Sequence, residues 1–235
     1  RLTIAGILLA LAMIKPQLAG PVAIWLVLWA LSEWRVRWKL VVSFALSFAA
    51  LIVGGEILLP GWIKEFYSAV VAYRQYAAGG TLLEQMLPRA IAAPLLAVLL
   101  AAVAASCWYV RKVAAKDERF LYVTSLVLAV TLLVPPMYPP HYQLLLLPGV
   151  FLLARDARPT KIVFRFLYVF SAGLMVWSWL LAIVLAFASF FTVRSQQFWT
   201  APLWTTVLFP VPVIACLGWM VFERVPCLLR ERASQ

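Results

Sequence analysis

The chain has 235 residues, of which 65% are hydrophobic and 12% are charged, and its formal net charge is +11. Water-soluble domains carry about twice that charged fraction, so the composition excludes an ordinary soluble protein. The positive residues lie in short stretches between apolar segments, where they orient membrane proteins, and this placement argues against nucleic acid as a partner.

Long apolar segments dominate the chain from its first residues. Runs of roughly 18 or more apolar residues are typical of helices that span a membrane. We predict an all-α, polytopic membrane bundle of about eight transmembrane segments, some short or broken. Residues 1–235 are expected to form a single transmembrane domain. The predicted segments are 2–14, 18–34, 40–59, 90–110, 120–135, 143–154, 162–190 and 201–222.

The loops between these segments alternate in charge. Fifteen of the 20 Lys and Arg residues fall on one side of the predicted membrane and five on the other. Because cytoplasmic loops carry the excess of Lys and Arg, both ends of the chain are predicted to be cytoplasmic, in the cytoplasmic (plasma) membrane. The five residues predicted to face outward are Lys15, Lys64, Arg74, Arg89 and Arg194.

The first predicted segment, 2–14, is too short to cross a membrane. As a helix it reaches about 20 Å, whereas the hydrocarbon core is roughly 30 Å thick. A break at Lys15–Pro16–Gln17 follows it. Either the segment is the end of a longer span, or the break faces a cavity at membrane depth. In the cavity Lys15 would bind a phosphate; otherwise its side chain extends to the outer boundary of the membrane.

The longest outward connection, 60–89, contains an amphipathic stretch. Apolar residues recur in it at helical spacing, and aromatic residues accompany them, which predicts a helix lying in the outer membrane interface. The alternative is an amphipathic helix packed on the spans. Thr81 and Glu84 have the spacing of a capping box, which predicts a second short helix. The apolar residues of the first helix are Ile63, Phe66, Tyr67, Val70 and Val71.

A proline-rich break, PPMYPPHY at 135–142, precedes the short segment 143–154 and holds the single histidine, His141. A helix of 143–154 reaches only about 18 Å, so we expect this break also to face an outward-opening cavity. There His141 would hydrogen-bond a phosphate or a sugar hydroxyl, or transfer a proton. The alternative is a polar residue that caps the helix at the interface. Three cysteines without paired spacing and one histidine predict no metal site.

Two short motifs resemble a known enzyme family. The pattern of an apolar run, IKPQL at 14–18, a second apolar run and RVRWK at 35–39 resembles the mid-region of glycosyltransferase family 87. The proline-rich break followed by YQLLLLPGVFLLARDAR at 142–158 is also similar to that family. These are polytopic enzymes of the GT-C type that use a polyprenyl-phosphate sugar, typically mannose.

The resemblance implies transfer from a lipid-linked donor to a glycolipid or glycan acceptor on the outer face of the membrane. It implies no cofactor apart from the donor substrate, and membrane lipids as further partners. The residues then expected to bind the donor are Lys15, Gln17, Tyr142, Arg74, Arg89 and Arg194, with His141 as the catalytic candidate.

The sequence departs from the family at the catalytic base, an aspartate in the first outer loop. Its only aspartates, Asp117 and Asp156, lie in predicted cytoplasmic loops. Either the base precedes residue 1, which makes the chain the C-terminal part of a longer enzyme, or the protein does not catalyse. Two other functions stay open: a transporter or lipid flippase, and a non-catalytic membrane scaffold. An aspartate upstream would favour the enzyme, and an inverted repeat would favour the transporter.

Overall fold

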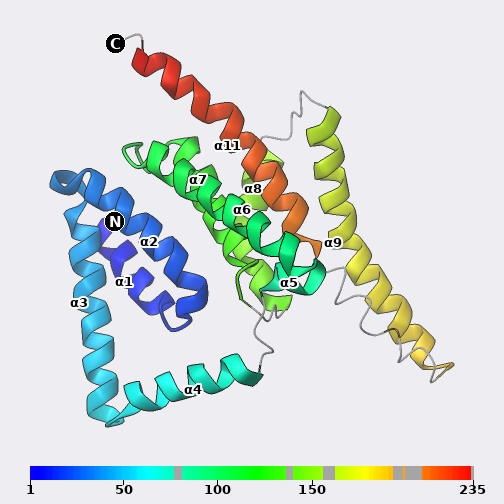
Figure 1. Ribbon diagram of the computed structural model, residues 1–235, viewed down its shortest axis with the longest axis horizontal. Coiled ribbons are helices and arrows are strands. Elements are labelled where there is room, and N and C mark those ends of the chain that lie inside the picture. Colours follow the sequence, from blue (N-terminus) through cyan, green and yellow to red (C-terminus); the bar gives the residue numbers. More distant parts are fainter. Residues whose placement is uncertain (77–80, 136–139, 156–161, 193–197, 199–207, 234–235) are drawn as a thin grey trace. The chain divides into compact units, whose positions relative to one another are not determined.

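A computed structural model describes residues 1–76, 81–135, 140–155, 162–192, 198 and 208–233. Within these ranges every regular element is a helix, which confirms the predicted all-α class (Figure 1). The elements are α1 (Leu2–Ala12), α2 (Pro16–Ser32), α3 (Trp34–Leu58), α4 (Trp62–Tyr76), α5 (Leu82–Met86), α6 (Arg89–Val110), α7 (Glu118–Thr131), the 3₁₀ helix η1 (Pro140–Leu146), α8 (Leu147–Arg155), α9 (Ile162–Ser189) and α11 (Pro210–Ala233).

Three helices in the described ranges are long and apolar enough to cross a membrane: α3, α6 and the part of α9 from Arg165 to Ser189. Four shorter apolar helices accompany them, among them α1 and α2. Large apolar side chains on the long helices, such as Leu46, Val98 and Phe187, are exposed, as expected where lipid is the solvent. The apolar helices indicate a membrane protein, and the number of eight spans stays a prediction.

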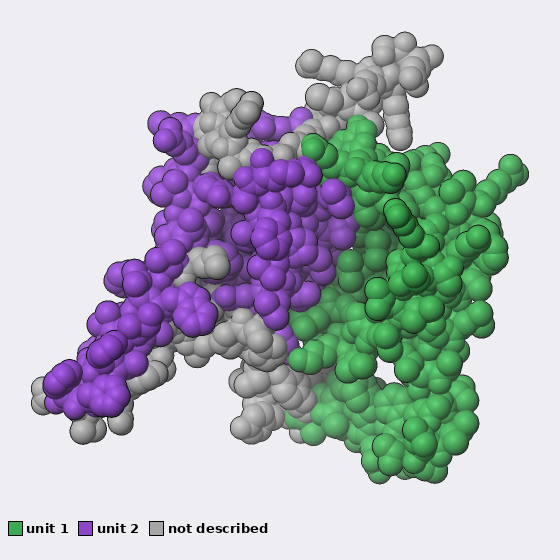
Figure 2. Space-filling view, turned by 180° about the vertical axis from the view of Figure 1, so that it is seen from behind, with its two compact units in different colours: residues 1–120, 133–137 green, residues 121–132, 138–235 purple. Residues whose placement is uncertain are grey.

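The chain divides into two compact units (Figure 2). The first unit comprises residues 1–120 and 133–137, and the second comprises 121–132 and 138–235.

In the first unit, α1 packs against α3 at very short range. Gly6 makes this possible, because a Cβ atom there would lie 2.5 Å from the Leu40 carbonyl oxygen and 2.8 Å from the Phe44 nitrogen, and would also collide with Ser43. Small residues allow membrane helices to approach closely, and van der Waals packing then holds them together. Gly6 therefore determines how closely α1 packs against α3.

A cluster of three aromatic side chains packs between α2 and the first turn of α7. Trp25 and Trp29 are both buried, and their rings lie 5.8 Å and 4.9 Å from the ring of Phe120. Tilted aromatic pairs at such distances add about 0.5–1.5 kcal/mol to the effect of burial alone. The cluster joins α2 to the beginning of α7.

The outward connection forms the two helices that the sequence predicts. α4 turns sharply away from the end of α3 (Figure 1). The apolar side chains of α4 include Phe66 and Tyr67, which are 47% and 70% exposed, and the choice between an interfacial helix and one packed on the spans stays a prediction. The capping box is confirmed, because the Thr81 backbone N–H donates to Glu84 and the Glu84 N–H donates to the Thr81 hydroxyl.

In the second unit, the residues Leu121–Leu132 are largely buried, and the Tyr122 hydroxyl donates to the Leu152 carbonyl at 3.4 Å. α11 packs on α8 and α9. Gly149 of α8 faces Leu217 of α11, where a Cβ would lie 2.9 Å from a Leu217 methyl carbon. As in the first unit, a glycine lies at a close contact between two apolar helices.

Three predicted segments differ from the structure. The segment predicted as 40–59 begins six residues earlier, because α3 starts at Trp34 and includes the residues 35–39 that were predicted as a loop. The segment 143–154 is not one α-helix, because η1 precedes α8; tight 3₁₀ turns are frequent at helix starts, and Pro148 fits the first turn of α8. Together the two helices reach up to about 27 Å, which is longer than the roughly 18 Å predicted for a helix of 143–154. The last segment, predicted as 201–222, continues as α11 to Ala233, and residues 201–207 lie outside the described ranges.

Candidate functional site

The break between α1 and α2 presents a lysine at the start of a helix. Lys15 is the N-cap of α2, Pro16 is its first residue, and the carbonyl of Lys15 accepts the N–H groups of Leu18 and Ala19, both at 3.0 Å. Proline is suited to this position because the N–H it lacks would have no partner within the helix. Lys15 and Gln17 are both exposed. The positive end of the helix dipole and the lysine therefore favour an anion at the same place.

The second predicted break belongs to the other unit. The backbone of His141 lies in η1, and its side chain lies outside the described part of the structure. Tyr142 is half-buried. Because Lys15 is in the first unit and Tyr142 in the second, their predicted common cavity stays a prediction.

Of the three arginines predicted to face outward, the structure describes one side chain. Arg89 begins α6, is 89% exposed and lies 3.3 Å from a carboxylate oxygen of Glu84. An exposed pair of this kind contributes little to stability, so Arg89 can exchange partners at small cost. The side chain of Arg74, on α4, and the whole of Arg194 lie outside the described part.

Three carboxylates, those of Glu56, Glu65 and Glu84, belong to the side predicted to face outward, and their surroundings differ. Glu65 is exposed on α4. Both oxygens of Glu84 are engaged, one by the capping box and one by Arg89. Glu56 is half-buried; its Oε1 accepts the N–H of Gly61 at 2.7 Å, and its Oε2 is enclosed without a hydrogen-bond partner. Among the carboxylates predicted to face outward, Glu56 is thus the one with a buried oxygen that has no hydrogen-bond partner.

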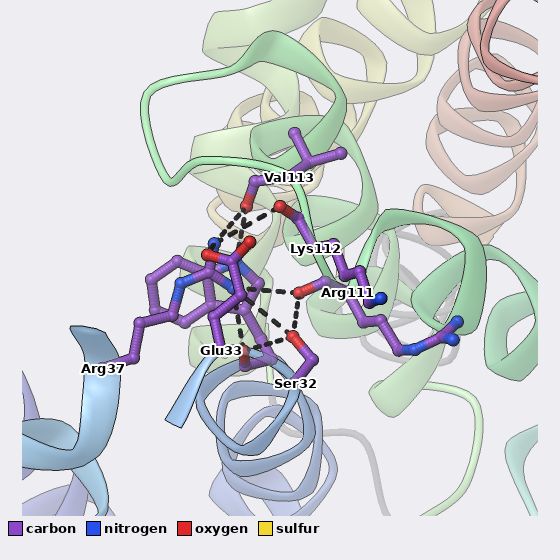
Figure 3. A network of polar contacts seen from close by, with 7 residues as sticks. Ser32, Glu33, Arg37, Arg111, Lys112 and Val113 are labelled. Atoms are coloured by element: carbon purple, nitrogen blue, oxygen red, sulfur yellow. Dashed lines mark hydrogen bonds and ion pairs between the residues drawn. The ribbon is translucent and has the colours of Figure 1, made fainter. Parts of the chain in front are cut away.

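The most extensive polar arrangement in the first unit surrounds Arg37, at the predicted cytoplasmic side (Figure 3). We call it the Arg37 network. Its members are the side chains of Arg37, Glu33 and Ser32 and the carbonyls of Trp29, Arg111, Lys112 and Val113.

The guanidinium of Arg37 is satisfied almost completely by this network. Its Nη1 donates to the carbonyls of Trp29 and Arg111, both at 2.9 Å, and its Nη2 donates to Val113 at 3.1 Å. The Glu33 carboxylate lies 2.6 Å away. Arg37 is only 4% exposed, so this is a buried cation whose donors are matched.

The carbonyls of the network come from the C-terminal ends of two helices. Trp29 lies in the last turn of α2, and 111–113 follow the end of α6 at Val110. Such carbonyls have no partner within their helix, and a cation is favourable at this end of the helix dipole. The Ser32 hydroxyl also donates to the Arg111 carbonyl, and the Trp29 indole donates to Val113 at 2.8 Å. The network therefore connects the end of α2 to the loop at 111–113. The hydrogen-bond donors on both Nη atoms of Arg37 are already engaged within the protein.

Sequence reasoning missed this role of Arg37. It grouped Arg37 with Arg35 and Lys39 as loop charges, but those two side chains are exposed. The available signal was the pairing of Glu33 with Arg37 at positions i and i+4, which is favourable on a helix.

No group of three or more His, Cys, Asp or Glu residues is close enough to hold a metal within the described ranges. The chain matches no protein-family model, no curated protein and no solved structure.

Proposed function

We propose that the protein is a membrane hexosyltransferase that transfers a sugar, typically mannose, from a polyprenyl-phosphate donor to a glycolipid or glycan acceptor. The observation that carries this proposal is the exposed Lys15 in the IKPQL motif, at the N-terminus of α2 and between two apolar helices. A lipid-linked phosphate needs an apolar path for its chain and a positive group for its charge, and this break combines the two. The resemblance to glycosyltransferase family 87 supports the same reading.

The proposed roles follow from the charge that develops during transfer. An acceptor hydroxyl attacks the anomeric carbon, the bond from this carbon to the phosphate oxygen breaks, and the lipid phosphate leaves with the electron pair. Lys15 and an outward arginine such as Arg89 would offset the charge of the leaving phosphate, an electrostatic effect that often dominates catalysis. Gln17, Tyr142, Arg74 and Arg194 are proposed as further donor contacts, and His141 as a proton-transferring group.

The test is sugar transfer by the full-length protein in membranes, from radiolabelled polyprenyl-phosphate mannose. We expect Lys15→Ala to lower the rate at least about tenfold, because one charge-assisted contact to the leaving group is worth about 1.4 kcal/mol or more. Lys15→Arg should retain part of the activity. Lys64→Ala is the matched control, because Lys64 is also exposed and predicted to face outward, but lies on α4.

The outcomes separate the possible functions. Loss of transfer in Lys15→Ala with normal transfer in Lys64→Ala supports the donor site. Equal transfer by both variants would remove Lys15 from the site while leaving the enzyme class intact. A wild-type protein that transfers no lipid-linked sugar, but moves lipid-linked sugars across vesicle membranes, would instead be a flippase.

A further inference from the structure

The corner between α3 and α4 is built by Glu56, Gly61 and Trp62. α3 ends at Leu58, α4 begins at Trp62, and Gly61 between them has a φ of +85°, a conformation that residues with a Cβ rarely adopt. The Gly61 N–H donates to Glu56 Oε1 at 2.7 Å. The indole of Trp62 folds back onto α3, so that its Nε1 lies 2.8 Å from the position of a Cβ on Gly55. The carboxylate and the indole are therefore brought to the same turn of α3.

Two polar atoms at this corner are buried and have no hydrogen-bond partner: Glu56 Oε2 and Trp62 Nε1. Within the described residues, these two are the only buried side-chain nitrogen or oxygen atoms without a hydrogen-bond partner. A buried polar group without a partner costs about 1–3 kcal/mol, so a pair of them at one turn favours an occupant that satisfies both. Glu56 and Trp62 are each half-buried as whole residues, so the pair lies close to the surface.

The chemistry of the two atoms restricts the occupant. An ionised carboxylate only accepts hydrogen bonds, and an indole N–H only donates one. An ammonium group can satisfy the carboxylate but cannot accept from the indole. A phosphate can accept from the indole but is repelled by the carboxylate. A hydroxyl group, like water, donates and accepts at once, and therefore matches both atoms.

The location of the corner indicates where such hydroxyls come from. α3 is apolar enough to span a membrane, and α4 exposes a row of apolar side chains, with Ile63 at 47% and Val71 at 41% exposure. A helix of this kind lies at the boundary between acyl chains and headgroups. We infer that the α3–α4 corner binds a hydroxyl group of a polyol, either a sugar or glycerol headgroup of a lipid or a free sugar, between Glu56 and Trp62. This inference does not depend on the proposed transfer activity.

The experiment uses the full-length protein labelled with 5-fluorotryptophan in phosphatidylcholine nanodiscs. The fluorine resonance of Trp62 is identified as the one missing from Trp62→Phe among the signals of the 11 tryptophans. Two probes are titrated separately: glucosyl-diacylglycerol, a neutral lipid with headgroup hydroxyls, and soluble methyl glucoside. Phosphatidylcholine is the reference because its headgroup has no hydroxyl.

We expect a saturable shift of the Trp62 resonance with at least one probe, and the probe that acts identifies the source as lipid or free sugar. Glu56→Gln keeps an oxygen for the Gly61 N–H but loses the charged acceptor, so the half-saturation concentration should rise about tenfold or more. Glu65→Gln, the same change at an exposed glutamate of α4, should leave the half-saturation concentration unchanged. A Trp62 resonance that responds to neither probe, or responds equally in wild type and Glu56→Gln, overturns the inference.

Discussion

The guanidinium carbon of Arg37 lies 3.9 Å from the centre of the Trp29 ring, and the same guanidinium donates to the Trp29 carbonyl at 2.9 Å. Arg37 thus contacts both the ring and the backbone of one residue. Desolvated cation–π contacts are worth about 2 kcal/mol, and this one adds to hydrogen bonds with the loop after α6. One side chain of α3 therefore reinforces the contact between α2 and this loop, which Trp29 and Ser32 of α2 also make directly.

Replacement of Arg37 by alanine should destabilise the protein strongly. It removes the guanidinium donors from the carbonyls of Trp29, Arg111 and Val113, which then keep only the Ser32 hydroxyl or the Trp29 indole, and it leaves Glu33 without its partner. A hydrogen bond that involves a charged group contributes about 1.5–3 kcal/mol, and several are lost here. Thermal unfolding in detergent, followed by near-ultraviolet circular dichroism, measures the effect.

Arg35→Ala is the matched control for this change, because Arg35 lies on the same helix and is exposed. Its melting temperature should stay within a degree or two of the wild type. Arg37→Lys should be intermediate, since a lysine keeps the charge but not the planar set of five donors. Equal melting temperatures for Arg37→Ala and Arg35→Ala would contradict the importance of the network.

Gly6→Ala should weaken the contact of α1 with α3. The added Cβ meets backbone atoms of Leu40 and Phe44, which cannot move as a flexible side chain can, and overpacking of this kind costs about 1–3 kcal/mol. Gly20→Ala is the opposite control: nothing lies within 4 Å of a Cβ there, and alanine in a helix is about 1 kcal/mol better than glycine. The two melting temperatures should shift in opposite directions; a shared direction would disprove the close contact.

Gly61→Ala should destabilise the corner by about 1–2 kcal/mol, because its φ of +85° forces a Cβ too close to the backbone. Gly54→Ala, in α3 and with open space around its Cβ, should be neutral or stabilising. Hydrogen–deuterium exchange of the first turn of α4 measures the difference. Unchanged exchange in Gly61→Ala would show that the corner adopts another backbone conformation.

Thr81→Ala should increase the amide exchange of α5 without changing the rest of the protein. The Thr81 hydroxyl accepts the Glu84 N–H, and loss of an N-cap costs about 1 kcal/mol. Thr81→Ser keeps the acceptor and should behave like the wild type. If serine and alanine gave the same exchange, the capping box would not hold the helix.

Local signals in the sequence predicted local structure well. The capping box needs only Thr81 and Glu84, three residues apart, and both of its hydrogen bonds are present. The helix predicted at 162–190 is found at Ile162–Ser189, since a continuous apolar run leaves little choice in a membrane. The start of α8 was missed because the change from a 3₁₀ to an α-helix depends on packing as well as on the prolines around it.

Contacts between distant segments were not predictable in the same way. Charge counting placed Arg37 in a loop cluster, whereas its partners at 111–113 lie more than 70 residues away. The special position of Glu56 could not be predicted, because the enclosure of its second oxygen depends on how Gly61 turns the chain and where Trp62 then lies. Composition specifies which residues can take part in such sites, and the fold decides which of them do.

The long sequence separation within the Arg37 network has a consequence for biosynthesis. Arg37 and Val113 are 76 positions apart, so the ribosome needs roughly 4–15 seconds to complete the partner loop after Arg37 has been made. During that interval Arg37 has only its earlier partners, Glu33 and the Trp29 carbonyl, and lacks the carbonyls at 111–113. Water must solvate the remaining guanidinium donors until α6 and the loop after it have been made, so α2 and α3 reach their complete set of contacts only after that step.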